Sequence, residues 1–130
     1  MTYLLDVNVL VAFGLINHSL HVRVTDWILA NGPMVVATCA ITELGFVRVI
    51  AQTPSYGLTV AEARSQLQAL KGLPNLTWEF LGDQLDVSQL PRWVKTGNQT
   101  TDGHLIQLAT AHNATLATLD AKIPAAFLIP

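Results

Sequence analysis

Two kinds of apolar pattern alternate along the chain. Short apolar runs are typical of buried strands, and apolar residues that recur every three or four positions are typical of helices packed on one side. The runs predict strands at residues 3–6, 34–38, 76–81, 114–120 and 125–130. The repeats predict helices at residues 7–13, 19–30, 40–52, 59–72 and 100–113. Strands that alternate with helices indicate a parallel sheet with helices on both faces. We therefore expect residues 1–130 to form a single α/β domain, a three-layer α/β/α sandwich.

Several helix ends carry recognisable signals. Thr59 and Glu62 have the spacing of a capping box, in which each side chain binds the backbone N–H of the other residue. The helix that starts near residue 100 is expected to be capped by Thr100 or Thr101. These signals fix where the two helices begin.

The composition indicates a folded protein with a weakly polar surface. Of its 130 residues, 51% are hydrophobic and 12% are charged, which excludes a disordered chain and favours contact with another copy or a protein partner. The apolar run at residues 9–16 is too short to cross a membrane, and no basic segment precedes it. Cys39 is the single cysteine, so no internal disulfide can form. We expect a cytoplasmic protein with no membrane contact.

The net charge argues against binding nucleic acid through basic side chains alone. Proteins that grip phosphates are usually basic, whereas this chain has a formal net charge of −2 and scattered Lys and Arg residues. If the protein handles nucleic acid, another source of positive charge must help to neutralise phosphate.

Four of the nine acidic residues follow strands or begin helices. Asp6 ends the first strand and Asp120 ends the fourth, while Glu43 and Asp102 lie in the first turns of their helices. In an α/β sheet the carboxyl ends of strands and the starts of the next helices line the same rim. These four carboxylates are therefore expected to converge on one crevice.

Converging carboxylates repel one another unless a cation lies between them. Mg²⁺ prefers oxygen ligands and combines a few carboxylates with substrate phosphate, which is the equipment of a phosphodiester hydrolase. Each acid also has a purely structural interpretation. Glu43 and Asp102 would complement helix dipoles, and Asp120 would form a turn. Asp6 resists such an interpretation because its neighbours in sequence are apolar.

Four segments together resemble a known family. The stretches "LLDVNVLV", "ITELGFVRV", "TTDGHLIQLA" and "ATLATLD" resemble, in order and approximate spacing, the PIN domain, and in particular the VapC-type toxins of bacterial toxin–antitoxin pairs. The resemblance covers essentially the whole chain. It implies a PIN-like fold and an endoribonuclease that depends on Mg²⁺ or Mn²⁺ and leaves a 5′-phosphate and a 3′-hydroxyl. It also implies a homodimer that is held inactive by a cognate antitoxin.

The resemblance assigns roles to seven residues. It implies that the catalytic and metal-binding acids are Asp6, Glu43, Asp102 and Asp120. It assigns supporting roles to Asn8, Thr118 and Arg48, the last as support for the site or a contact to phosphate. The chain departs from many relatives after the last acid, where Ala121 and Lys122 follow instead of a further acidic residue.

Two other functions compete with the nuclease. A haloacid-dehalogenase-like phosphatase also places an aspartate after its first strand, but it needs a second aspartate where this chain has Asn8. A PIN-like module that has lost catalysis would bind a partner only, but the retained acids favour the enzyme. His18 and His21 have a spacing that could hold a transition metal, although no third ligand stands nearby in sequence.

Overall fold

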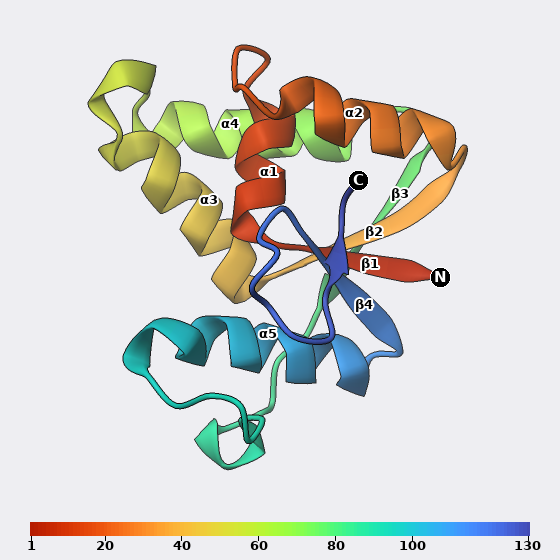
Figure 1. The fold of residues 1–130 in the computed structure, drawn as a ribbon. Coiled ribbons are helices and arrows are strands. Elements are labelled where there is room, and N and C mark those ends of the chain that lie inside the picture. Colours follow the sequence, from red (N-terminus) through yellow and green to blue (C-terminus); the bar gives the residue numbers. More distant parts are fainter.

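The computed structural model describes all 130 residues and has a five-stranded parallel sheet at its centre (Figure 1). The order of the strands across the sheet is β3-β2-β1-β4-β5, and every neighbouring pair is parallel. The strands are β1 (Thr2–Leu5), β2 (Met34–Cys39), β3 (Leu76–Leu81), β4 (Ala114–Thr118) and β5 (Phe127–Leu128).

Five α-helices connect the strands. They are α1 (Val7–Gly14), α2 (His21–Ala30), α3 (Ala40–Gln52), α4 (Val60–Lys71) and α5 (Thr100–Ala111). Single 3₁₀ turns form at Pro54–Tyr56, Val87–Gln89 and Gly97–Gln99. None of the helices is long and apolar enough to cross a membrane.

The helices cover the two faces of the sheet unequally. Figure 1 shows α1 to α4 on one side of the strands and α5 on the other. Because successive strand residues point to opposite faces, Leu5 and Val36 join the core under α1 to α4, while Leu4 and Ala37 join the core under α5. The structure confirms the predicted three-layer α/β/α sandwich. We call the two faces the α1–α4 side and the α5 side.

Close packing of α1 on α3 requires a glycine. A Cβ atom on Gly45 would lie 2.5 Å from a methyl carbon of Val7, which is closer than two carbon atoms can approach. The glycine therefore lets the second turn of α3 lie directly against the first turn of α1. Predicted site residues lie close in sequence to this contact, with Asn8 next to Val7 and Glu43 two residues before Gly45.

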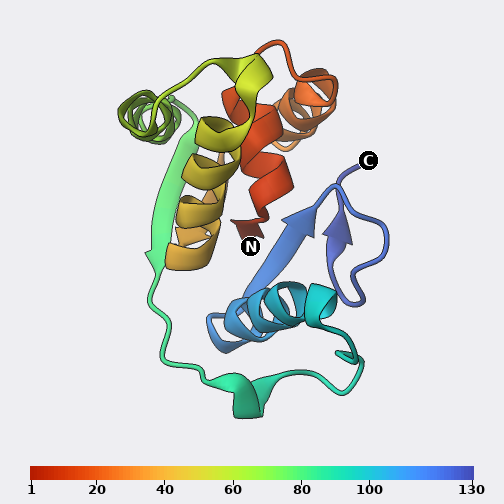
Figure 2. The ribbon, with the colours of Figure 1, turned by 90° about the vertical axis from the view of Figure 1, so that its left-hand side faces the viewer.

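The path of the chain creates a crevice between β1 and β4. From β1 the chain moves outward to β2 and β3, and it then returns through α5 to place β4 on the other side of β1. Figure 2 shows the segment between β3 and α5 running beneath α5 before that helix begins. The strand order reverses at β1 and β4. A crevice forms beyond the carboxyl ends of strands at such a point, and α/β proteins bind ligands there.

Most predicted elements are confirmed, and their ends differ by a few residues. Strand β3 and helix α3 have the predicted bounds, and Thr59 and Glu62 form the expected capping box. The expected cap of α5 was wrong. Gln99 occupies the cap position without a side-chain bond, because a 3₁₀ turn leads directly into the helix and Thr100 bonds the carbonyl of that turn.

Candidate functional site

Asp6 is a buried carboxylate at the carboxyl end of β1. It caps α1, since its Oδ1 accepts a hydrogen bond from the backbone N–H of Val7 at 2.8 Å, and its Oδ2 accepts one from the hydroxyl of Thr118 at 2.8 Å. Only 6% of the residue is exposed. Burial raises the pKa of Asp6, the two hydrogen bonds oppose that rise, and the nearby charge of Asp120 adds to it. The site therefore holds a buried carboxylate whose ionised form accepts two hydrogen bonds but has no positive side chain beside it.

Hydrogen bonds around Thr118 connect the two sides of the crevice between β1 and β4. The Thr118 hydroxyl oxygen accepts from the Asn8 side-chain amide at 3.2 Å and from the backbone N–H of Asp120 at 3.1 Å. The Asn8 carbonyl oxygen accepts from the backbone N–H of Leu119 at 3.1 Å. These bonds tie the first turn of α1 to the end of β4, so they fix the position of Asp6 relative to Asp120.

Asp102 approaches the same place from α5. It lies in the first turn of that helix and is half-buried. Burial raises the pKa of Asp102, and the negative charges of Asp6 and Asp120 raise it further. Three carboxylates from three distant segments thus influence one another across the crevice.

A cavity of about 380 Å³ opens at these acids. Its walls come from α1, the loop between α1 and α2, α3, the turn after α3, α5 and the end of β4. The residues that line it are Asp6, Val7, Asn8, Val11, His18, Val49, Tyr56, Asp102 and Asp120. No lysine or arginine is among them.

The protein provides no ion pair for the three acids of the cavity. Its two ion pairs join Lys71 to Glu43 and His104 to Asp83, both outside the cavity. Carboxylate oxygens without a protein counter-ion suit a hard divalent cation such as Mg²⁺ or Mn²⁺. No three acidic, histidine or cysteine side chains lie close enough together to form a complete ligand set. The residues fit such a cation in chemistry and charge, and Mg²⁺ usually keeps several water ligands beside one or two carboxylates.

Asp120 has a structural bond as well as a place in the cavity. Its Oδ1 accepts from the backbone N–H of Lys122 at 2.9 Å, which makes the turn of the structural interpretation given for this aspartate. Its Oδ2 makes no hydrogen bond with the protein. One oxygen therefore shapes the turn, and the other is available to a ligand.

Glu43 lies outside the cavity, in contrast to the expectation that four acids converge. Its Oε2 accepts from the Thr38 hydroxyl and from the Lys71 ammonium, each at 2.5 Å. Thr38 follows Val36 by two residues on β2 and so faces the α1–α4 side. The hydrogen bonds that Glu43 accepts thus come from β2 and α4, and Glu43 is not among the residues that line the cavity.

Arg48 also lies outside the cavity. It is exposed on α3 and makes no hydrogen bond or ion pair, although its neighbour Val49 lines the cavity wall. The guanidinium of Arg48 is therefore exposed to solvent, and no hydrogen bond or ion pair within the protein fixes its position.

His18 and Tyr56 line the cavity and were not predicted as site residues. His18 attracted notice only for its spacing from His21, as a pair for a transition metal. The two rings have separate partners: Nδ1 of His18 accepts from the backbone N–H of Leu20, and Nδ1 of His21 bonds the carbonyl of Ala12. Tyr56 gave no signal in sequence, because a 3₁₀ turn after α3 brings it to the cavity.

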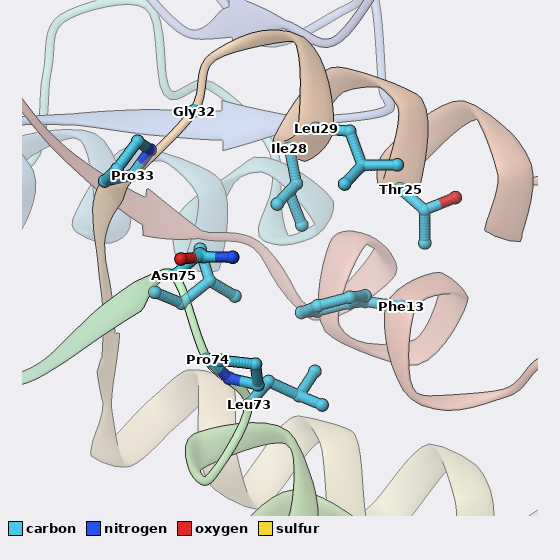
Figure 3. A pocket seen from close by; sticks show the side chains of 10 residues that line it. Phe13, Thr25, Ile28, Leu29, Gly32, Pro33, Leu73, Pro74 and Asn75 are labelled. Atoms are coloured by element: carbon cyan, nitrogen blue, oxygen red, sulfur yellow. The ribbon is translucent and has the colours of Figure 1, made fainter.

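A larger, mostly apolar cavity lies away from these acids, between α2 and the segments that lead into β2 and β3 (Figure 3). Figure 3 shows Ile28, Leu29, Phe13 and Leu73 around it. Its lining contains no acid, base, histidine or cysteine. It offers apolar surface but no group for general acid–base chemistry or metal binding, so the acidic cavity is the candidate for catalysis.

Comparison with known proteins agrees with this geometry. The family model of the PIN domain matches residues 3–126. The chain is 38% identical to Ribonuclease VapC38 of Mycobacterium tuberculosis over 125 residues, which are 92% of this chain and 86% of that protein. It is 35% identical to Ribonuclease VapC29 of the same organism over 124 residues, covering 95% and 89% of the two chains.

Solved structures show the same fold at low sequence identity. The crystal structure of Mycobacterium tuberculosis VapC20, described as a toxin that cleaves the sarcin-ricin loop, superposes with a TM-score of 0.65 at 13% identity and covers 95% of this chain and 93% of that one. VapBC2 from Rickettsia felis, solved bound to a DNA fragment from its promoter, gives a TM-score of 0.59 at 18% identity, covering 98% and 97%. These matches argue against the haloacid-dehalogenase alternative. The chain belongs to the PIN-domain family of VapC ribonucleases.

Proposed function

We propose that this protein is an endoribonuclease that requires Mg²⁺ or Mn²⁺ and acts as the toxin of a type II toxin–antitoxin pair. The observation that carries the proposal is the buried Asp6, which shares a cavity with Asp102 and Asp120 and has no protein cation beside it. The family relation supports RNA as the substrate, since curated proteins similar to this chain are named ribonucleases.

Asp6, Asp102 and Asp120 would hold the cation. When bound, such an ion polarises a phosphoryl oxygen, lowers the pKa of a water molecule and supplies positive charge that the cavity walls lack. Glu43 is the fourth predicted ligand. Because it binds Lys71, it would join the others only if that ion pair opened, directly or through water.

The residues of the chain prepare the reaction by fixing positions. Asn8 and Thr118 hold Asp6 against the end of β4, so that the carboxylates do not have to be ordered during the reaction. Hydrolysis adds the oxygen of water to phosphorus and breaks the bond from phosphorus to O3′. A proton passes to O3′, so the products are a 5′-phosphate and a 3′-hydroxyl.

We infer that the substrate is an exposed single-stranded loop, since sequence-specific RNA binding usually targets unpaired nucleotides. Arg48, which is exposed on α3 near the cavity wall, is proposed to contact phosphates outside the cavity.

We also propose a protein partner, namely a cognate antitoxin, and a homodimer in the cytoplasm. The Rickettsia felis structural neighbour is a VapBC2 assembly, which supports an antitoxin. Large apolar side chains that are more than half exposed offer surface for such contacts: Met1, Ile16, Val22, Leu29, Leu44, Val60, Phe80 and Val87.

The test is cleavage of total cellular RNA by the purified protein with and without Mg²⁺. We expect cleavage only with the metal, and its loss in Asp6→Asn. Asp26→Asn is the matched control, because it removes an exposed carboxylate on α2 outside the cavity. Activity of Asp6→Asn equal to that of the wild type would reject the site. Absence of both cleavage and metal binding in the wild type would favour the non-catalytic module.

A further inference from the structure

The loop between α1 and α2 holds His18 in a fixed position at the acidic cavity. The backbone N–H of His18 donates to the carbonyl of Leu15 at 2.9 Å, and the backbone N–H of His21 donates to the carbonyl of His18 at 3.0 Å. The His18 ring is fixed as well, since its Nδ1 accepts from the backbone N–H of Leu20 at 3.0 Å. Main chain and ring are therefore both anchored.

This anchoring determines which ring nitrogen carries a proton. Because Nδ1 of His18 accepts a hydrogen bond, it presents its lone pair to Leu20, and the proton of the neutral ring is on Nε2. Nε2 makes no hydrogen bond with the protein, and the half-buried ring lines the cavity. The cavity thus contains an N–H donor without a protein acceptor.

The chemistry of the other polar side chains indicates what this donor binds. Asp6, Asp102 and Asp120 offer only acceptor oxygens when ionised, and the Asn8 amide gives one of its two N–H groups to Thr118. A phosphate oxygen needs donors, and no lysine or arginine lines the cavity. The side-chain donors available there are Nε2 of His18, the hydroxyl of Tyr56 and the second N–H of Asn8, and among them the His18 ring is held in place by its own bond from Leu20.

We propose that His18 is an RNA-binding residue whose Nε2–H donates to a non-bridging oxygen of the substrate phosphate in the cavity. The assignment rests on the proposed nuclease function and deepens it by naming a contact to the phosphate group. His18 holds the phosphate from the α1–α2 loop, while the acids and their cation act from the strand ends. The contact is made both before and during the reaction, so it contributes to substrate binding more than to turnover.

Two substitutions separate this role from the structural role of the ring. Asn at position 18 can place an oxygen near the position of Nδ1 and keep the bond from Leu20, but it cannot reach as far as Nε2. Gln can place an amide N–H near the position of Nε2, but it loses the turn. His21→Asn is the matched control, since His21 bonds Ala12 and does not line the cavity.

The first measurement is the kinetics of RNA cleavage, with melting temperature recorded for each variant. We expect His18→Asn to raise KM about tenfold or more with kcat changed by less than about twofold, as for loss of a hydrogen bond to a charged group. His18→Gln should keep KM closer to that of the wild type, and His21→Asn should match the wild type. An unchanged KM in His18→Asn would overturn the proposal. Cleavage that is retained in His18→Asn but lost in His18→Gln would overturn it as well.

The second measurement does not depend on cleavage. Ring ¹H–¹⁵N spectra of the wild type are recorded during titration with adenosine 5′-monophosphate in Mg²⁺, and we expect the Nε2 signal of His18 to shift while that of His21 does not. No shift at His18 would overturn the proposal whether or not the protein cleaves RNA. If cleavage fails but His18 shifts, the nuclease function is wrong and the phosphate contact stands. If cleavage requires Asp6 but neither KM nor the Nε2 signal responds at His18, the nuclease function is supported and the proposal for His18 is wrong.

Discussion

Two buried or half-buried acids at neighbouring strand ends have opposite surroundings. Glu43 has a lysine partner supplied by α4 and a hydroxyl supplied by β2. Asp6 has a hydroxyl and a backbone N–H but no cation, and two further carboxylates share its cavity. In sequence the two acids look alike, because each lies where a strand passes into a helix.

Glu43 is neutralised by a lysine of the same protein, whereas the three acids of the cavity have no such partner and need an external cation. The Glu43–Lys71 pair is complete within the protein and requires no ligand to be stable. The cavity with Asp6, Asp102 and Asp120 gathers like charges, which raise the pKa of Asp102 in addition to its burial. Only the second arrangement favours binding of a divalent cation, so the two regions should respond differently to the same substitution.

The largest expected difference is in catalysis. Asp6→Asn should reduce the rate of RNA cleavage by about 10²-fold or more, because loss of a metal ligand removes several kcal/mol of transition-state stabilisation. Glu43→Gln should reduce it by less than about 10-fold if Lys71 keeps the acid out of the site. Rates measured with total RNA at saturating Mg²⁺ check this. Equal losses in both variants would mean that Glu43 joins the site when metal binds.

A second difference concerns stability and pH in the absence of metal. Burial raises the pKa of Asp6 above the ordinary aspartate value of 3.8, so folding favours its protonated form. The stability that Asp6 contributes is complete below about 3.8, and it is lost as pH rises through the higher pKa of the folded state. Wild type should therefore lose stability relative to Asp6→Asn between pH 4 and pH 7. Urea unfolding in EDTA at several pH values measures this, and a gap that grows in the other direction would contradict it.

A smaller effect is expected from removal of the lysine beside Glu43. Lys71→Met should lower the free energy of unfolding by about 0.5–1 kcal/mol, since both partners are about one quarter exposed, at 26% and 25%. RNA cleavage should stay within about twofold of the wild type. Lys95→Met is the control, because the Lys95 side chain is exposed and makes no bond. A large loss of cleavage in Lys71→Met alone would place the ion pair within the active site.

The smallest effect is expected at the ion pair on the far side of α5. Burial opposes ionisation of Asp83, but bonds from His104 and Leu85 and the charges of His104 and His112 together lower the pKa of Asp83. Asp83→Asn should cost at most about 0.5 kcal/mol at pH 7. Because the folded pKa is lowered, this stability is present above the unfolded value and is lost as pH falls through the folded pKa. Thermal melts at pH 7 and pH 3 would show whether the difference between variant and wild type shrinks in acid.

Local pattern was enough to predict most of the fold. The apolar run of β3 and the capping box of α4 are properties of a few adjacent residues, and both elements form where expected. The placement of three acids in one cavity also followed from local pattern, since parallel strands end on the same rim. Their roles as metal ligands stay predictions.

What the sequence could not predict depends on contacts between distant segments. Lys71 lies 28 residues from Glu43, and nothing in the pattern near either residue indicates that α4 places the ammonium there. His18 lines the cavity from the loop between α1 and α2, and loop geometry has no periodic signal in sequence.

The central claim is that an external cation completes the cavity with Asp6, Asp102 and Asp120. Calorimetric titration of Mn²⁺ and Mg²⁺ into the wild type, Asp6→Asn and Glu43→Gln tests it most directly. We expect saturable binding in the wild type and in Glu43→Gln, and none in Asp6→Asn. Binding to Asp6→Asn as tight as to the wild type, or no binding to any of the three proteins, would contradict the account.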